Sequence, residues 1–328
     1  MKNRSNHISF GLVTLMAVML LALGACNKIP GAGPAEKWTY YTSANSGLIN
    51  NEITCLTEDT KGNIWIGTKY GFSRFDGQHF TNWQDKSGLI YHDITAIAVD
   101  KQGNIWLGTP YGVSEFNGQS FVNYTTANGL SSNNVYSIAV DNQNVVWIGT
   151  GKGVCAFDGS KWTYYQKVGG EALVDNHVRS VLVDHQDRKW FGTEYGVSKF
   201  YNGTWTTYLS LKALGNYVFV VFQDSKNNIW FGTMAGALRL DVSGNQVSFT
   251  KDNGLINNQV QCIAEDNRGD LWFGTQFGVS KYNGSSIENY TTVNGLAADW
   301  TTAILKSPNG DLWFGSVNKG IAVLHFSH

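Results

Sequence analysis

The chain has few charged residues, almost no net charge and few cysteines, and each shortage excludes a class of protein. Charged residues make up 15% of its 328 residues, against about 25% in ordinary soluble domains, which excludes a disordered chain or a coiled coil. The net charge is −1, so the chain lacks the basic surface that nucleic-acid binding requires. Four cysteines without a Cys-x-x-Cys pair indicate neither a disulfide framework nor a zinc site.

Glycine and aromatic residues are abundant instead. The chain contains 37 glycines, and Trp, Tyr and Phe make up 13% of it. Glycine adopts the positive φ that tight turns need, and aromatic side chains pack well on a pleated sheet. The composition therefore predicts an all-β fold of short strands joined by tight turns.

The N-terminus has the layout of a signal peptide. Lys2 and Arg4 precede an apolar run from Ile8 to Leu23, which is short for a membrane span and typical of a signal peptide over residues 1–25. The run ends in Leu-Gly-Ala-Cys, which resembles the lipobox of bacterial lipoproteins. This resemblance implies that Cys26 carries a lipid; an ordinary signal peptide followed by a chance cysteine is the alternative.

Residues 26–36 contain two of the chain's four prolines, and we expect them to form a flexible tether. The sequence then predicts a bacterial cell-envelope protein held by its lipid anchor alone. We expect it in the outer membrane, on the periplasmic or the surface face.

A repeat of about 41 residues organises the rest of the chain. The motif Trp-x-Gly-Thr occurs six times and Trp-Phe-Gly-Ser once, at Trp65, Trp106, Trp147, Trp190, Trp230, Trp272 and Trp313. Each repeat fits four short strands, which in the second repeat would be residues 93–100, 104–109, 112–116 and 120–125. Radial packing of such units buries both faces of each sheet, so residues 37–328 are predicted to form a seven-bladed β-propeller with four antiparallel strands per blade.

The two ends of this region complement each other. The last repeat stops after its third strand, and residues 37–41 repeat the fourth-strand sequence of residues 161–165 letter for letter. We therefore expect residues 37–42 to pair with residues 321–326 and to complete blade seven, which leaves no open sheet edge.

The repeats resemble those of the two-component regulator propeller family. The resemblance is carried by segments such as residues 257–266, followed by Gly-Asp-Leu-Trp-Phe-Gly-Thr at 269–275, and it extends over residues 37–328. In that family the propeller commonly forms the periplasmic input part of hybrid sensor kinases, which often respond to glycans. No transmitter domain follows the propeller in this sequence, so we expect a stand-alone lipoprotein that is not itself a kinase. A weaker resemblance to streptogramin lyase provides no match for that enzyme's catalytic pair.

Positions that all repeats share are predicted to build the framework. We expect the seven tryptophans in the core, with the following glycine allowing neighbouring blades to approach. Cys55 and Cys262 are predicted to be small fillers near the axis, and Cys155 to be inert. Turns such as Asp266–Asp270 lack the bidentate Glu of a calcium loop, and we expect neither a metal nor another cofactor.

Function is expected where the repeats differ, on the face where the longer loops surround the channel. The candidate ligand-binding residues are Tyr70, Tyr111, His177, Arg179, Glu194, Tyr195, Tyr217, Phe277 and Trp300. Four of them are aromatic residues at one repeat position, and the alternative is that each ring packs on the adjacent blade. Two atypical connections, 168–177 and 209–217, place five of the candidates in the sector of blades four and five.

Three functions fit these residues. A ligand-binding or sensing lipoprotein is favoured, because rings interspersed with polar groups suit a glycan, although a peptide would fit too. A scaffold for another envelope protein is the second. The third is an enzyme similar to streptogramin lyase, in which His177 and Glu194 would supply a base and an acid. We lean towards recognition without catalysis.

Overall fold

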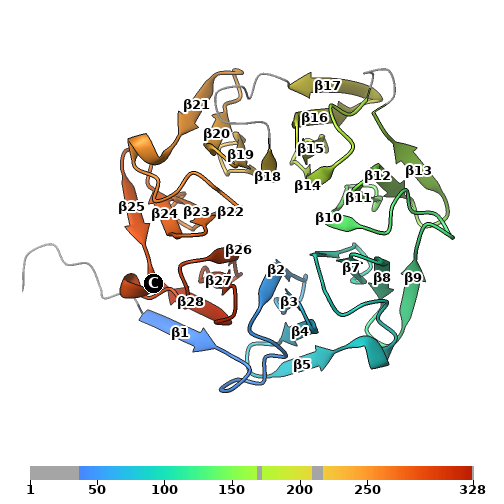
Figure 1. Ribbon diagram of the computed structural model, residues 1–328, viewed down its shortest axis with the longest axis horizontal. Helices are drawn as coiled ribbons and strands as arrows, with labels where there is room; N and C mark the ends of the chain where they lie inside the picture. The colour runs from blue at the N-terminus through green and yellow to red at the C-terminus, as the bar shows by residue number, and fades with distance from the viewer. Residues whose placement is uncertain (1–36, 168–171, 209–216, 327–328) are drawn as a thin grey trace, which may run out of the picture. The chain divides into compact units, whose positions relative to one another are not determined.

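Seven four-stranded antiparallel sheets are arranged around a central axis (Figure 1). The computed structural model describes residues 37–167, 172–208 and 217–326. Cys26, the predicted signal peptide and the predicted tether lie outside the described residues, as do parts of the two atypical connections. The predicted all-β, seven-bladed β-propeller is confirmed.

Blades are numbered along the chain. Blade one contains β2 (Ile53–Glu58), β3 (Ile64–Thr68), β4 (Gly71–Phe75) and β5 (Phe80–Trp83); blade two β6 (Ala96–Val99), β7 (Ile105–Thr109), β8 (Gly112–Phe116) and β9 (Phe121–Tyr124); blade three β10 (Val135–Val140), β11 (Val146–Thr150), β12 (Gly153–Phe157) and β13 (Trp162–Tyr165); blade four β14 (Val178–Val183), β15 (Lys189–Thr193), β16 (Gly196–Tyr201) and β17 (Thr204–Tyr208). Blade five contains β18 (Val218–Gln223), β19 (Ile229–Thr233), β20 (Gly236–Leu240) and β21 (Gln246–Phe249); blade six β22 (Cys262–Glu265), β23 (Leu271–Thr275), β24 (Gly278–Tyr282) and β25 (Ile287–Tyr290); blade seven β26 (Thr301–Lys306), β27 (Leu312–Ser316), β28 (Ile321–His325) and β1 (Lys37–Tyr41).

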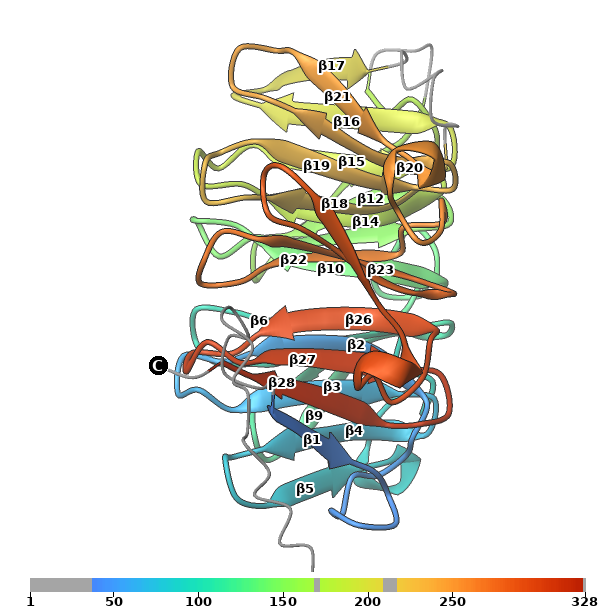
Figure 2. The same ribbon diagram turned by 90° about the vertical axis from the view of Figure 1, so that its left-hand side faces the viewer.

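The strands run from one face of the propeller to the other, so that all connections lie on two opposite faces (Figure 2). The face towards the viewer in Figure 1, here called the upper face, carries the loops that lead into each first strand and those between second and third strands. The opposite, lower face carries the turns between first and second and between third and fourth strands.

Closure occurs as the sequence predicts. β1 pairs antiparallel with β28, with Lys37 opposite His325 and Tyr41 opposite Ile321. The ring of Tyr41 stacks on Trp313 with centroids 5.4 Å apart. The first and last described strands thus share one sheet, which removes the unpaired edge that an open ring would expose.

The repeated tryptophans are buried between blades, as expected, with at most 5% of each residue exposed. Trp106 of blade two, for example, contacts Phe157 of blade three at a centroid distance of 5.9 Å. Burying an indole of this size stabilises the fold by several kcal/mol, of the order of 3. The core is therefore divided into clusters, each of which joins two neighbouring blades.

Each turn between first and second strands is tied to its tryptophan. In six blades an aspartate at the start of this turn accepts a hydrogen bond from the indole Nε1 of the repeat tryptophan, at 2.7–3.1 Å; these aspartates are Asp59, Asp100, Asp141, Asp184, Asp224 and Asp266. Its other oxygen accepts backbone N–H groups of the turn, as Asp266 does from Arg268 and Asp270. The Asp-x-x-Gly pattern therefore has a structural role.

The glycine and the threonine of the motif also have structural roles. A methyl group on Gly108 would lie 2.6 Å from Val135 Cγ1 of the next blade, so only glycine permits the blades to approach this closely. Thr109 Oγ1 donates to the carbonyl of Gly112 at 3.0 Å and accepts the N–H of Tyr111 at 3.0 Å, which closes the loop between second and third strands.

The three cysteines of the described chain are free thiols. Burial raises the pKa of Cys55 and of Cys262 to about 12, and it also raises the pKa of Cys155. Thiolates are the reactive form of cysteine, so these thiols are inert fillers at neutral pH, as the sequence predicts.

Candidate functional site

A ring of seven side chains lines the upper mouth of the axial channel, one from the start of each first strand. In five blades this residue lies at a β-bulge, where the pairing of the first with the second strand skips one position. A bulge re-aims a side chain away from the regular alternation of the strand. The ring consists of Thr54, Thr95, Tyr136, Arg179, Phe219, Gln261 and Thr302. In blade two the predicted strand 93–100 is correspondingly shortened to β6, which begins just after the ring residue.

The ring encloses a cavity of about 630 Å³. Residues from the upper-face loops complete its walls: Glu52, Lys69, Tyr217, Trp300 and Val317. Three predicted site residues, Arg179, Tyr217 and Trp300, therefore lie in one cavity. A cavity of this volume suits a small ligand or the end of a longer one.

Arg179 lies between two tyrosine rings and is held by a carboxylate. Its Cζ is 4.0 Å from the ring centroid of Tyr136 and 5.5 Å from that of Tyr217. Its Nε donates to Glu194 Oε1 at 3.0 Å, and its Nη2 donates to the same oxygen. Both partners are about three-quarters buried, so the guanidinium presents a fixed plane to the cavity.

The electrostatics of this group keep Arg179 charged. Burial opposes the charged form, but the hydrogen bonds to Glu194 and the neighbouring tyrosines outweigh it, so the pKa of Arg179 is raised. Burial also raises the pKa of Tyr217, which the positive charge of Arg179 opposes. The cavity therefore offers the neutral phenol of Tyr217 beside an internally compensated ion pair, a suitable surface for an uncharged polar ligand.

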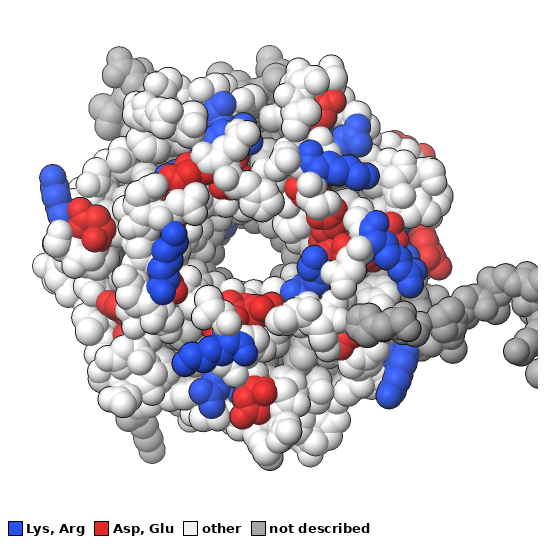
Figure 3. All heavy atoms as spheres, turned by 180° about the vertical axis from the view of Figure 1, so that it is seen from behind, with Lys and Arg blue, Asp and Glu red and all other residues white. Residues whose placement is uncertain are grey.

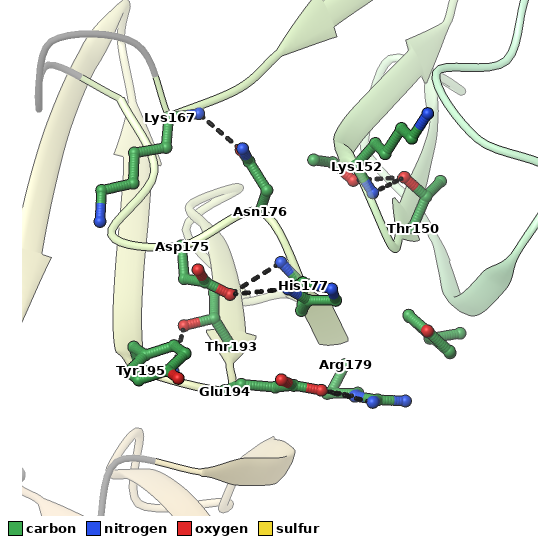
Figure 4. A network of polar contacts seen from close by, with 12 residues as sticks. Thr150, Lys152, Lys167, Asp175, Asn176, His177, Arg179, Thr193, Glu194 and Tyr195 are labelled. Atoms are coloured by element: carbon green, nitrogen blue, oxygen red, sulfur yellow. Dashed lines mark hydrogen bonds and ion pairs between the residues drawn. The ribbon is translucent and has the colours of Figure 1, made fainter.

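His177 and Tyr195 do not join this group (Figure 4). The imidazole Nδ1 of His177 lies 3.4 Å from Asp175 Oδ1, whereas Glu194 extends to Arg179. The acid–base pair that the enzyme alternative would need, His177 with Glu194, is therefore not formed: each side chain contacts another partner. The ring of Tyr195 lies outside the cavity, and 60% of this residue is exposed.

The other side of the mouth carries a second set of polar contacts. Trp300 donates its Nε1 hydrogen to Gln261 Oε1 at 2.8 Å, which fixes the indole at the rim. Lys69 Nζ pairs with Asp93 Oδ2 at 2.9 Å. The mouth thus combines rings, an amide and two ion pairs.

The remaining predicted residues, Tyr70, Tyr111 and Phe277, lie on the upper face outside the cavity. Their exposed fractions are 57%, 57% and 61%, so none of the three rings is buried. Tyr70 stacks on His92 with centroids 5.7 Å apart, and Tyr111 contacts Tyr91 at 4.4 Å. They form an exposed aromatic margin around the mouth.

Sequence reasoning missed Tyr136, Gln261, Lys69 and Glu52 as lining residues. A signal for the first two was present, because each lies eleven residues before its repeat tryptophan, as Arg179 does. Lys69 and Glu52 occupy loop positions at which the repeats vary without a shared pattern. Among the described residues, no group of three or more His, Cys, Asp or Glu is placed to hold a metal ion.

The lower mouth of the channel differs in character. Acidic and basic side chains are interspersed around an open centre on this face (Figure 3). The rings of Tyr136, Tyr217, Phe219 and Trp300 line the upper cavity, which makes it the candidate site.

Fold and site together define a seven-bladed β-propeller with an axial recognition cavity. The model of the family described as two component regulator propeller matches residues 47–70, 88–111, 129–152, 213–235 and 254–277. The chain therefore carries two component regulator propeller repeats, as its sequence resemblance predicts. No protein with a curated description matches the chain.

Solved structures with this fold include domains of larger proteins. The extracellular domain of BT3049 from B. thetaiotaomicron, described as a hybrid two component system, is 25% identical with a TM-score of 0.76; the match covers 88% of this chain and 41% of that one. The extracellular domain of BT4673 from the same organism is 18% identical with a TM-score of 0.76, over 90% of this chain and 40% of that one. This chain thus spans about two fifths of these relatives.

An enzyme shares the fold as well. Virginiamycin B lyase from Staphylococcus aureus is 15% identical with a TM-score of 0.72, and the match covers 89% of this chain and all of that one. At this identity the likeness concerns the fold alone.

In the described part of this chain, no helix has the length and apolar character that a membrane crossing needs.

Proposed function

We propose that this chain is a recognition module of the bacterial cell envelope that binds a neutral glycan end in its axial cavity. The arrangement of Arg179 between Tyr136 and Tyr217 is the observation that carries the proposal. Phenol rings stack on the C–H faces of sugars, while guanidinium, amide and carboxylate groups exchange directional hydrogen bonds with hydroxyls. The pairing of Arg179 with Glu194 disfavours a strongly anionic ligand, because the positive charge is already compensated.

The relatives support a sensing role. Two of them are extracellular domains of proteins described as two component or one component systems. Recognition of an external molecule is the task that such a domain would share with this chain. Any output would then depend on another protein, which would be a signalling partner in the envelope.

The test is a binding screen of the purified protein against neutral oligosaccharides and, in parallel, short peptides. For the best oligosaccharide, Tyr136→Ala should weaken binding by about ten- to a hundredfold, since a ring at the centre of a site is worth about 1–3 kcal/mol. Tyr201→Ala, which removes a half-exposed ring at the end of β16, is the matched control and should bind like the parent. Binding of peptides alone, or parental affinity in Tyr136→Ala, would contradict the proposal.

We also propose that Cys26 anchors the protein to the outer membrane through a lipid. The lipobox-like run before Cys26 supports this, and two acyl signals or more give stable anchoring. Cys26→Ala should then leave the protein soluble in the periplasm or uncleaved at the inner membrane, while Cys155→Ala should fractionate like the parent. Recovery of Cys26→Ala in the outer-membrane fraction, with the same detergent partitioning as the parent, would contradict the proposal.

A further inference from the structure

A second cavity, of about 390 Å³, lies between blades four and five on the lower face. It is built by turns and by residues of the second, third and fourth strands, and it shares no lining residue with the axial cavity. Its walls include Arg188, Trp190, Lys199, Tyr208, Asp241 and Gln246.

Two cations occupy repeat positions that hold at most one cation in every other blade. The residues two before and nine after the repeat tryptophan contact each other in blade two, where Asn104 donates to Glu115 at 3.0 Å. In blade six the same positions form an ion pair, Lys281 with Asp270 at 3.2 Å. In blade four they are Arg188 and Lys199. Blades one and five carry a single cation here, Arg74 and Arg239, so blade four differs in having two, and like charges at neighbouring sheet positions are destabilising.

Of these two cations, Lys199 is the one without an anion. Arg188 donates to Asp184, whose side chain is fully buried. Lys199 Nζ lies 5.5 Å from the ring centroid of Trp190 and 3.4 Å from the hydroxyl of Tyr208. No carboxylate in the described part of the chain comes within ion-pair distance of it. The half-buried ammonium group therefore faces the cavity uncompensated.

The opposite wall carries a fixed negative charge. Asp241 accepts hydrogen bonds from the Nδ2 and backbone N–H groups of Asn245 and from the N–H of Ser243, at 2.8–2.9 Å. These bonds lower the pKa of Asp241, so the carboxylate is ionised at neutral pH. They also fix its orientation within the turn. The cavity thus presents a cation and an anion on separate walls.

We propose that this cavity binds a small molecule with a carboxylate next to an ammonium or hydroxyl group, an amino acid or a hydroxy acid. The ligand carboxylate pairs with Lys199, and the adjacent donor pairs with Asp241. Tyr208 and Leu240 provide apolar surface for the rest of the ligand. This site is independent of the axial cavity and of the function proposed for it.

Three isosteric probes test the proposal on the full chain by calorimetry: phenylalanine, phenyllactate and 3-phenylpropionate. On the carbon next to the carboxylate they carry an ammonium group, a hydroxyl group and a hydrogen atom, respectively. Affinity should fall in this order, by about tenfold overall, because charge-assisted hydrogen bonds are stronger than neutral ones. Absence of saturable binding, or equal affinity for all three, would overturn the proposal.

Variants separate this site from the axial one. Lys199→Gln should weaken phenylalanine binding about tenfold, whereas Lys199→Arg, Lys281→Gln and Tyr136→Ala should bind like the parent. Asp241→Asn should remove the preference for phenylalanine over 3-phenylpropionate. A melting curve of each variant checks folding, and parental binding by a folded Lys199→Gln would overturn the assignment.

Discussion

The two halves of the channel ring use one backbone position in different ways. In blades seven and two the ring residues are threonines, whose hydroxyl groups donate across the blade boundary: Thr302 Oγ1 to the carbonyl of Ile53, and Thr95 Oγ1 to that of Val135, each at 2.7 Å. In blades three to five the same position holds Tyr136, Arg179 and Phe219, whose side chains extend over the cavity.

This difference shows how a repeat protein can acquire a site without altering its fold. Thr95 and Thr302 each fasten one first strand to the next, so that this part of the ring is framework. Larger residues give up this bond and gain a surface that can contact a ligand. Since the repeat is held by its tryptophan, aspartate and glycine positions, the ring residue can vary at little cost.

The largest expected effect tests this division between framework and ring. Trp190→Ala should lower the free energy of unfolding by about 3–5 kcal/mol, because it empties a buried site between blades and leaves Asp184 without its indole donor. Tyr136→Ala should cost less than half of that, since this ring borders the open cavity. Urea unfolding of both variants measures the difference.

Equal destabilisation by the two substitutions would break the comparison. It would mean that the ring residues of blades three to five also hold the blades together. Trp147→Ala is the matched variant in the neighbouring blade. It should behave like Trp190→Ala, because Trp147 donates to the equivalent aspartate of its own blade, Asp141, and is also buried.

Much of the fold could be predicted from the sequence, because its determinants repeat. Seven tryptophans at intervals of about 41 residues predict seven blades, and the match of residues 37–41 to a fourth strand predicts the closure that β1 and β28 make. The turn residues of one repeat are sufficient to predict its strands, since each blade repeats the same pattern.

The site was less predictable because side-chain direction at the ring depends on β-bulges, which the residue types do not reveal. Tyr136 was overlooked for this reason, although its repeat position was available. His177 and Glu194 are neighbours in the sector, but only the structure shows that Glu194 turns to Arg179 and His177 to Asp175. Tyr70, Tyr111 and Phe277 are exposed on the upper face and do not line the cavity.

The smallest expected effect addresses the threonine half of the ring. Thr302→Val keeps the shape of the side chain and removes the hydroxyl, which leaves the carbonyl of Ile53 without this donor. The free energy of unfolding should fall by about 1 kcal/mol, the usual net value of one such hydrogen bond. Thr163→Val on the exposed outer strand β13 is the control and should change stability by less than half of this. If the two variants unfold at the same urea concentration, the threonine half of the ring does not fasten the blades, and both halves are then equally free to contact a ligand.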